Sequence, residues 1–147
     1  MKHRIYVASS WRNAHQPNVC EYLRVLGHDV YDFRDPIQGS GFGWDAASPY
    51  SPETWSVRQF REVLQTPVAS RGLSRDAAGL RWCTALVLVM PCGASSHLEL
   101  GWAIAANKHT AVYYPEKVPV QAELMVGLAD AILDGATNDL ERWIGQV

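Results

Sequence analysis

Short apolar runs alternate along the chain with segments whose apolar residues recur at helical spacing. The runs have the composition of buried parallel strands and lie at residues 4–10, 28–33, 84–90 and 110–115, with a short fifth strand expected around 131–133. Helices are expected at residues 13–26, 53–65, 68–83, 97–107 and 138–147, and in the first part of 122–135. This alternation predicts an α/β fold, a three-layer flavodoxin/Rossmann-like domain with a parallel sheet of about five strands.

The first strand, helix and second strand form a unit that predicts where a ligand binds. Val19, Tyr22 and Leu26 recur at helical spacing, and Gly27 is placed to end the helix. A crossover of this length implies a right-handed parallel pairing of the two strands. Ligands in such sheets bind beyond the carboxyl ends of the strands, at a point where the strand order reverses.

Residues 34–53, "RDPIQGSGFGWDAASPYSPE", interrupt the alternation with three glycines and three prolines. A loop this long in a compact domain is usually functional or disordered. The aromatic residues Trp44 and Tyr50 favour an active-site lid over a loop that is simply exposed to solvent. After the next helix, Pro67 is expected to interrupt the chain before the helix at 68–83.

Composition narrows the class of protein. The chain has 147 residues, 48% of them hydrophobic, and a formal net charge of −2 without a block of like charge. This favours one globular domain spanning residues 1–147, with no nucleic-acid polymer and no membrane as partner. Three cysteines without metal-ligand spacing and an N-terminus without a signal-peptide core indicate the cytoplasm.

Two motifs fail on their spacing, and no metal site is expected. Gly39, Gly41 and Gly43 resemble a dinucleotide loop, but Trp44 stands where the third glycine belongs. Cys92 would need an arginine six positions later to act as a phosphatase nucleophile, and that position is a leucine, so we expect a small residue in a tight turn. The five histidines are scattered without ligand spacing.

The segment "PCGASSHLELGWAIAANK", residues 91–108, places Glu99 after the most hydrophobic run of the chain. Ser95 and Ser96 are N-cap candidates, so Glu99 is expected in the first helical turn, where the helix dipole favours its ionised form. Such a carboxylate suits an oxocarbenium-like sugar centre as nucleophile or electrostatic stabiliser. Gly101 would remove bulk where the helix meets the sheet or a ligand. The alternative is a capping-box glutamate that reaches back to Ser96, and spacing alone leaves both open.

The segments "IYVASSWRN" and "SSHLELGWAIAANK" resemble the nucleoside 2-deoxyribosyltransferase family and its related nucleotide N-glycosidases. The resemblance covers most of the chain and is most specific at residues 99–103, "ELGWA". It implies that Glu99 attacks C1′ of a (deoxy)ribosyl group as the base leaves. It also implies that Tyr6 orients this glutamate, and that Asp76 hydrogen-bonds or protonates the departing base. For Asp76 the alternative is an exposed helix acid.

The turn before Glu99 departs from the transferase pattern, which is acidic there, whereas this chain has "CGASS". Relatives that hydrolyse nucleoside 5′-monophosphates have a small Ser- and Gly-containing turn that holds the phosphate. His97 could add a donor or simply be packed, and Trp44 and then Trp11 could stack on a base or belong to the core. The resulting substrate-binding candidates are Ser9, Trp11, Trp44, Gly93, Ser95, Ser96, His97 and Gly101.

These residues favour an enzyme that cleaves the N-glycosidic bond of a (deoxy)nucleoside or its 5′-monophosphate and passes the sugar to another base or to water. Two alternatives are a TIR-like NAD glycohydrolase and a non-catalytic nucleotide-binding or sensor module. No cofactor is expected. The resemblance also implies a homo-oligomer, a dimer or larger. Residues that would suit an interface or a core helix equally are Leu124, Met125, Leu128, Trp143 and Ile144.

Overall fold

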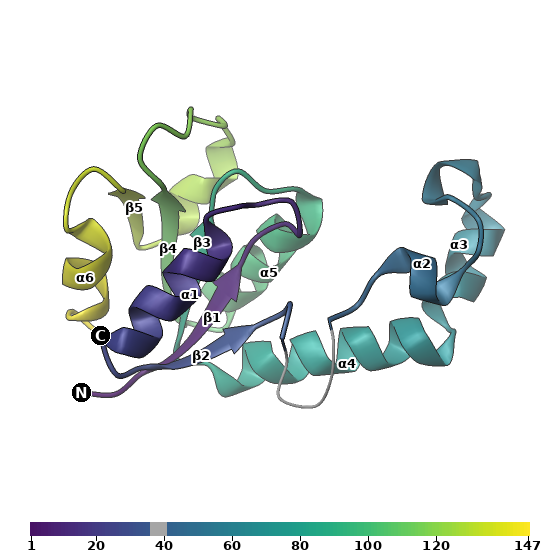
Figure 1. Ribbon diagram of the computed structural model, residues 1–147, viewed down its shortest axis with the longest axis horizontal. Helices are drawn as coiled ribbons and strands as arrows, with labels where there is room; N and C mark the ends of the chain where they lie inside the picture. Colours follow the sequence, from purple (N-terminus) through teal and green to yellow (C-terminus); the bar gives the residue numbers. More distant parts are fainter. Residues whose placement is uncertain (36–40) are drawn as a thin grey trace. The chain divides into compact units, whose positions relative to one another are not determined.

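Five parallel strands form one sheet in the computed structural model, which describes residues 1–35 and 41–147. The strands are β1 (Arg4–Ala8), β2 (Asp29–Asp32), β3 (Ala85–Val89), β4 (His109–Tyr114) and β5 (Ala131–Asp134). Their order is β2-β1-β3-β4-β5 (Figure 1). The chain leaves β1 for β2 on one side and later returns to β3 on the other. The carboxyl ends of β1 and β3 therefore flank the reversal point where such sheets bind ligands.

Helices cover both faces of this sheet, which confirms the predicted fold class. Helices α1 (Gln16–Val25) and α6 (Asp139–Ile144) pack on one face, and α5 (Ala94–Ala105) packs on the other (Figure 1). Gly27 follows α1 with a φ of 93°, the left-handed conformation that glycine adopts most readily. No helix in the described part of the chain is long and apolar enough to cross a membrane.

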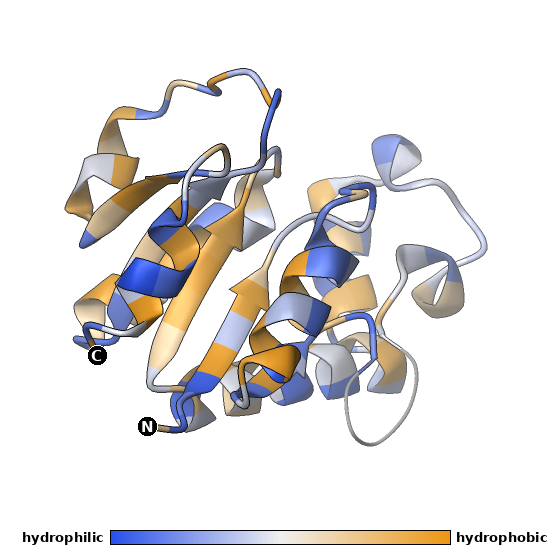
Figure 2. Cartoon of the chain, turned by 60° about the vertical axis from the view of Figure 1, so that its left-hand side comes forward, coloured by the Kyte–Doolittle hydropathy of each residue, from blue (hydrophilic) through white to orange (hydrophobic). Residues whose placement is uncertain are grey.

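Alternation along the strands divides their side chains between the two faces. The core on the α1 and α6 face contains Ile5, Val7, Val19, Cys20, Leu23, Ala85, Val87, Val89, Ala111, Leu133, Leu140, Trp143 and Ile144. Because successive residues of a strand point to opposite faces, Tyr6 and Ala8 point to the face that α5 covers. Strand β3 is buried along its whole length, which explains its continuous apolar sequence (Figure 2).

The chain divides into two compact units, residues Met1–Asp32 with Trp82–Val147, and Phe33–Arg81. The second unit contains α2 (Trp44–Ala47), the 3-10 helix η1 (Pro52–Thr54), α3 (Val57–Leu64) and most of α4 (Pro67–Trp82). Ser56 begins α3 with a capping box, in which its hydroxyl accepts from the N–H of Gln59 (3.1 Å) and the Gln59 amide accepts from the N–H of Ser56 (2.7 Å).

Aromatic packing orders the segment that the sequence pattern left as a loop. Trp44 packs edge-to-face on Phe42, Trp55 and Phe60, with ring centroids 4.8, 5.6 and 6.1 Å away. The helix α2 and the start of η1 therefore lie within residues 41–53, where the sequence predicts no regular structure, and α3 begins at Val57 rather than at residue 53. Residues 36–40, which include Gly39, lie outside the described part. The prediction of a lid stays untested for this segment.

Other boundaries also differ from the sequence pattern. The two helices break before Pro67, as predicted, but Pro67 itself is the first residue of α4, because a proline at the first helical position has no N–H to leave unpaired. The helix expected in 122–135 is only the 3-10 helix η2 (Leu124–Leu128). Of the residues that suited a core or an interface, Trp143 and Ile144 belong to the core, whereas Leu124, Met125 and Leu128 are exposed, Leu124 at 93%.

Candidate active site

The turn between β3 and α5 is the centre of the candidate site, since it lies at the carboxyl end of the central strand. Gly93 is the N-cap of α5, with extended backbone angles, and the helix begins at Ala94. The expected start near residue 97, with Ser95 or Ser96 as N-cap, is therefore wrong. Both serines are inside the first helical turn. No side chain among the described residues caps this end, which leaves its first N–H groups for solvent or a ligand.

The earlier start of α5 changes the position of Glu99. It is the sixth residue of the helix and lies in the second turn, so it is not the capping-box partner of Ser96. Ser96, Leu100 and Ala103 form the buried stripe of α5, and Glu99 lies beside this stripe. The Glu99 side chain is half-buried and its Oε2 atom is buried. A carboxylate is thus held between the protein interior and the surface.

Tyr6 lies on the same face of the sheet as α5. It is wholly buried, and its ring stacks on Tyr31 with centroids 4.8 Å apart and an interplanar angle of 19°. In the sheet, Tyr6 pairs with Leu86 of β3, three residues before the strand ends. The hydroxyl oxygen of Tyr6 is also buried. Tyr6 and Glu99 therefore both belong to the α5 side of strands β1 and β3.

Cys92, in the turn itself, is not a reactive thiolate. Burial, reinforced by the negative charge of Glu99, raises the pKa of the Cys92 thiol to about 12, and a hydrogen bond from Ser96 opposes this only in part. The thiol is therefore protonated at neutral pH, which argues against a nucleophilic role for Cys92.

His97 belongs to the first turns of α5 and borders a cavity. Its Nδ1 lies 2.7 Å from the carbonyl oxygen of Gly93, and because a carbonyl can only accept, Nδ1 carries the proton. Nε2 of the neutral ring is then an acceptor, and it becomes a donor to an anion only when the ring is protonated. A cavity of about 580 Å³ lies between α5 and η2, lined by Gly93, His97 and Gly101 among others.

The other substrate-binding candidates in the first unit differ in exposure. Ser9 is buried, and its hydroxyl donates to the carbonyl oxygen of Val89 (2.8 Å). Its hydroxyl therefore contacts the backbone at the end of β3. Trp11, after β1, is 51% exposed, and Ser95 is exposed as well. A Cβ atom added to Gly101 would meet nothing within 4 Å. Gly101 is therefore not packed closely on the sheet, and the alternative, a place beside a ligand, stays a prediction for this glycine, which lines the cavity.

Asp76 and Trp44 belong to the second unit. Asp76 is half-buried in α4, and Trp44 is held in the aromatic cluster with 38% of its surface exposed. Their assignments to the departing base and to base stacking stay predictions from the sequence. No group of three metal-ligating side chains occurs among residues 1–35 and 41–147.

Sequence reasoning missed two residues that hold the turn. Asn13 donates to the carbonyl oxygens of Val89 and Pro91, and Gln121 donates from Nε2 to the carbonyl oxygen of Cys92 (3.0 Å). Both contacts join segments distant in sequence, so no local pattern indicates them. The only signal was the asparagine of the "WRN" segment, within the stretch that carries the family resemblance.

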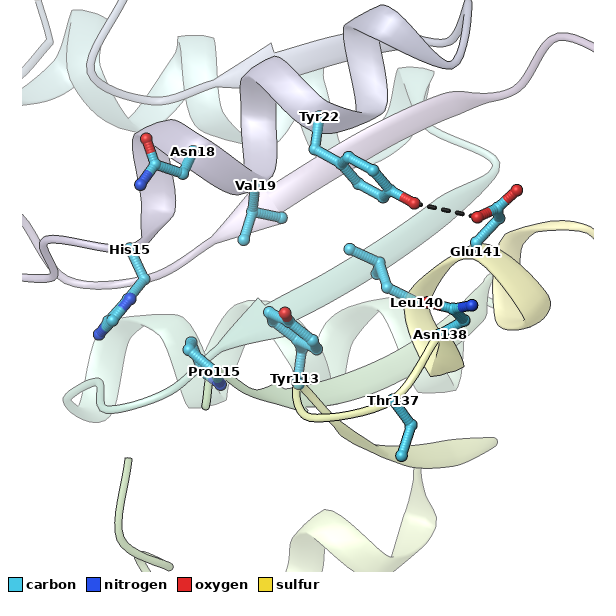
Figure 3. Close-up of a pocket in the computed structure, with 11 residues that line it drawn as sticks. His15, Asn18, Val19, Tyr22, Tyr113, Pro115, Thr137, Asn138, Leu140 and Glu141 are labelled. Carbon is cyan, nitrogen blue, oxygen red and sulfur yellow. Dashed lines mark hydrogen bonds between the residues drawn. The ribbon is translucent and has the colours of Figure 1, made fainter. Parts of the chain in front are cut away.

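A second cavity lies on the opposite face, at the carboxyl end of β4 between α1 and α6 (Figure 3). Its volume is about 310 Å³, and at its rim the Tyr22 hydroxyl donates to Glu141 Oε2 (3.1 Å). Burial raises the pKa of Tyr22 and of Tyr113, so both phenols stay protonated at neutral pH. This cavity includes neither Glu99 nor any residue of the β3–α5 turn.

Comparison with known proteins supports the fold. No protein-family model and no curated protein matches the sequence. Among solved structures, a 2-deoxyribosyltransferase from the psychrotolerant bacterium Bacillus psychrosaccharolyticus is similar with a TM-score of 0.53 and 20% identity, over 90% of this chain and 85% of that chain. The CMP N-glycosidase BcmB of Clostridium botulinum is similar with a TM-score of 0.52 and 15% identity, over 99% of this chain and 98% of that chain. These are the two kinds of enzyme that the sequence motifs resemble, and the likeness at these identities shows a shared fold.

Proposed function

We propose that this protein cleaves the N-glycosidic bond of a (deoxy)nucleoside or its 5′-monophosphate, with Glu99 as nucleophile. The observation that carries the proposal is the half-buried Glu99 carboxylate beside the β3–α5 turn, at the carboxyl end of the central parallel strand. The fold shared with a 2-deoxyribosyltransferase and a CMP N-glycosidase supports it.

The reaction proceeds in two displacements. A carboxylate oxygen of Glu99 bonds to C1′ while the C1′–N bond breaks, and the departing base nitrogen keeps the electron pair and takes a proton. A second base or a water molecule then attacks C1′, breaks the ester bond and restores the carboxylate. Tyr6 orients the Glu99 carboxylate through its hydroxyl group. A half-buried carboxylate stabilises the positive charge that develops on the sugar.

The start of α5 suits a 5′-phosphate. The uncapped N–H groups of its first turn, the exposed Ser95 hydroxyl and the open space at Gly93 lie together at this helix end. Backbone N–H groups and the helix dipole favour a phosphate there. On this basis a nucleoside 5′-monophosphate is the preferred substrate class over the free nucleoside.

The proposal is tested by measuring the release of free base from a panel of substrates. The purified protein is incubated with nucleosides, deoxynucleosides, their 5′-monophosphates and NAD, with and without an acceptor base, and the products are separated by chromatography. Wild type should release a free base, and Glu99→Gln should lower the rate by roughly 10³-fold or more, equivalent to about 4 kcal/mol. The unfolding free energy of the variant should stay close to that of wild type, because Gln has nearly the same shape.

The panel also separates the alternatives. Transfer of the sugar to an added base identifies a transferase, and release to water alone identifies a hydrolase. Cleavage in Glu99→Gln at the wild-type rate refutes Glu99 as nucleophile. Release of nicotinamide from NAD, but of no base from the other compounds, identifies an NAD glycohydrolase. Nucleotide binding without turnover, unchanged in Glu99→Gln, identifies a binding module.

A further inference from the structure

Asn13 links the loop after β1 to the turn after β3. It is only 3% exposed, and both ends of its amide are used. Its Oδ1 accepts hydrogen bonds from the N–H groups of His15 (2.8 Å) and Gln16 (3.0 Å), which begin α1. Its Nδ2 donates to the carbonyl oxygens of Val89 (3.2 Å) and Pro91 (3.0 Å). One buried side chain therefore ties the start of α1 to the turn that leads into α5.

The turn depends on such contacts because α5 has no side-chain cap among the described residues. The carbonyl oxygen of Val89 accepts a further hydrogen bond from Ser9 Oγ (2.8 Å). Gln121 holds the carbonyl oxygen of Cys92 from the other side (3.0 Å). The Nδ2 group of Asn13 is the only one of these donors that contacts two turn carbonyls in the described part of the chain. Hydrogen bonds from residues outside α5 therefore hold the turn at which this helix begins, and with it the position of Glu99.

We propose that Asn13 is a positioning residue for Glu99, because its Nδ2 group fixes the β3–α5 turn from which the Glu99 helix starts. The catalytic consequence rests on the proposed function. Asparagine suits both tasks because its amide has an acceptor at one end and two donors at the other. Aspartate has the acceptor but, when ionised, no donor, and serine is too short to replace both ends at once.

Asn13→Asp separates the two tasks. The carboxylate keeps an acceptor for the N–H groups that begin α1, but it loses both donors and faces two carbonyl oxygens. Asn13→Ser is a milder variant that keeps a short acceptor and adds no charge. Gln16→Glu is the control for a new buried carboxylate, since Gln16 is wholly buried and its Nε2 donates to Asp32 Oδ1 (2.9 Å) and Cys20 Sγ (3.2 Å) and not to the turn. The unfolding free energy of each variant is measured so that effects are compared at known stability.

Labelling of Cys92 reports on the turn without any assumption about activity. Cys92 is buried within the turn, and Cys83, which is wholly buried elsewhere, serves as the internal reference. Native protein is treated with a thiol reagent, and the labelled cysteine is identified by peptide mass spectrometry. Loss of two hydrogen bonds should speed labelling of Cys92 by about tenfold or more in Asn13→Asp, with a smaller effect in Asn13→Ser. Gln16→Glu should leave Cys92 close to the wild-type rate.

Turnover is the second measurement. In Asn13→Asp, kcat for base release should fall by about tenfold or more while KM changes less, because the geometry of the nucleophile changes and the bulk of the pocket does not. Equal Cys92 labelling in wild type and Asn13→Asp overturns the role of Asn13 in the turn. Faster labelling with unchanged kcat, or an equal loss of kcat in Gln16→Glu at equal stability, overturns positioning. If wild type releases no base at all, the proposed function fails, and Cys92 labelling still decides whether Asn13 fixes the turn.

Discussion

Replacing Tyr6 with phenylalanine separates the role of its hydroxyl group from that of its ring. The ring is wholly buried and stacks on Tyr31 at a centroid distance of 4.8 Å. Phenylalanine keeps the volume and the stacking, so no cavity forms. The free energy of unfolding should therefore fall by no more than about 3 kcal/mol, the upper value for one hydrogen bond to a charged group.

The expected effect on turnover is measured separately, on folded protein. In the proposed mechanism the Tyr6 hydroxyl donates to the Glu99 carboxylate, and hydrogen bonds to charged groups contribute about 1.5–3 kcal/mol. Losing such a bond lowers kcat by roughly ten- to a hundredfold, since each 1.36 kcal/mol changes a rate by about tenfold. The two effects are separable in one variant, because kcat is measured under conditions in which the protein stays folded.

The assay combines initial rates of base release at saturating substrate with urea unfolding followed by tryptophan fluorescence. Tyr31→Phe is the matched control, because it removes a hydroxyl from the stacked partner on β2, which lies on the far side of β1 from β3. Tyr31→Phe should turn over at close to the wild-type rate. A Tyr6→Phe variant with kcat within about twofold of wild type, or with a kcat loss no larger than its loss of stability explains, refutes the role of this hydroxyl.

Two further predictions concern charge and packing. The Glu99 carboxylate helps to raise the pKa of Cys92 to about 12, so Glu99→Gln should lower that pKa and shift the pH profile of Cys92 alkylation to lower pH. An unchanged profile would show that the charge of Glu99 does not act on Cys92. Gly72→Ala should destabilise the protein by about 1–3 kcal/mol, because its Cβ would lie 2.9 Å from Cβ of Phe42. Gly101→Ala, in open space within α5, should stabilise it by up to about 1 kcal/mol in the same urea experiment, and a loss of stability there would contradict the open surroundings of this residue.

The sequence alone was sufficient for the α/β class and for most of the strands of the sheet. Strand β3 is readable because a strand covered on both faces needs apolar residues at every position, and the run at residues 84–90 has them. Glu99 was identifiable as a candidate because a lone acid among small and apolar residues, directly after such a strand, is an unusual placement. Both conclusions depend on local composition, which a sequence contains in full.

Packing decided which apolar residues belong to the core. Trp143 and Ile144 of α6 are buried, whereas Leu124 and Met125 are exposed, although all four looked alike in the sequence. The difference is that α6 packs on the sheet face shared with α1, and η2 lies outside that core. Likewise, α2 forms around Trp44 because neighbouring aromatic rings meet it, which no periodicity within residues 34–53 indicated.

The geometry of the candidate site was decided by tertiary contacts as well. Serines 95 and 96 looked like N-caps, because local rules expect a polar side chain where a helix begins. Gly93 is the N-cap instead, the helix begins at Ala94, and the turn before it is held by hydrogen bonds from Asn13 and Gln121. Hydrogen bonds between distant segments leave no periodic trace in a sequence. The sequence by itself therefore determined that a carboxylate follows the central strand, and only the tertiary structure decided where on its helix that carboxylate lies and what holds it there.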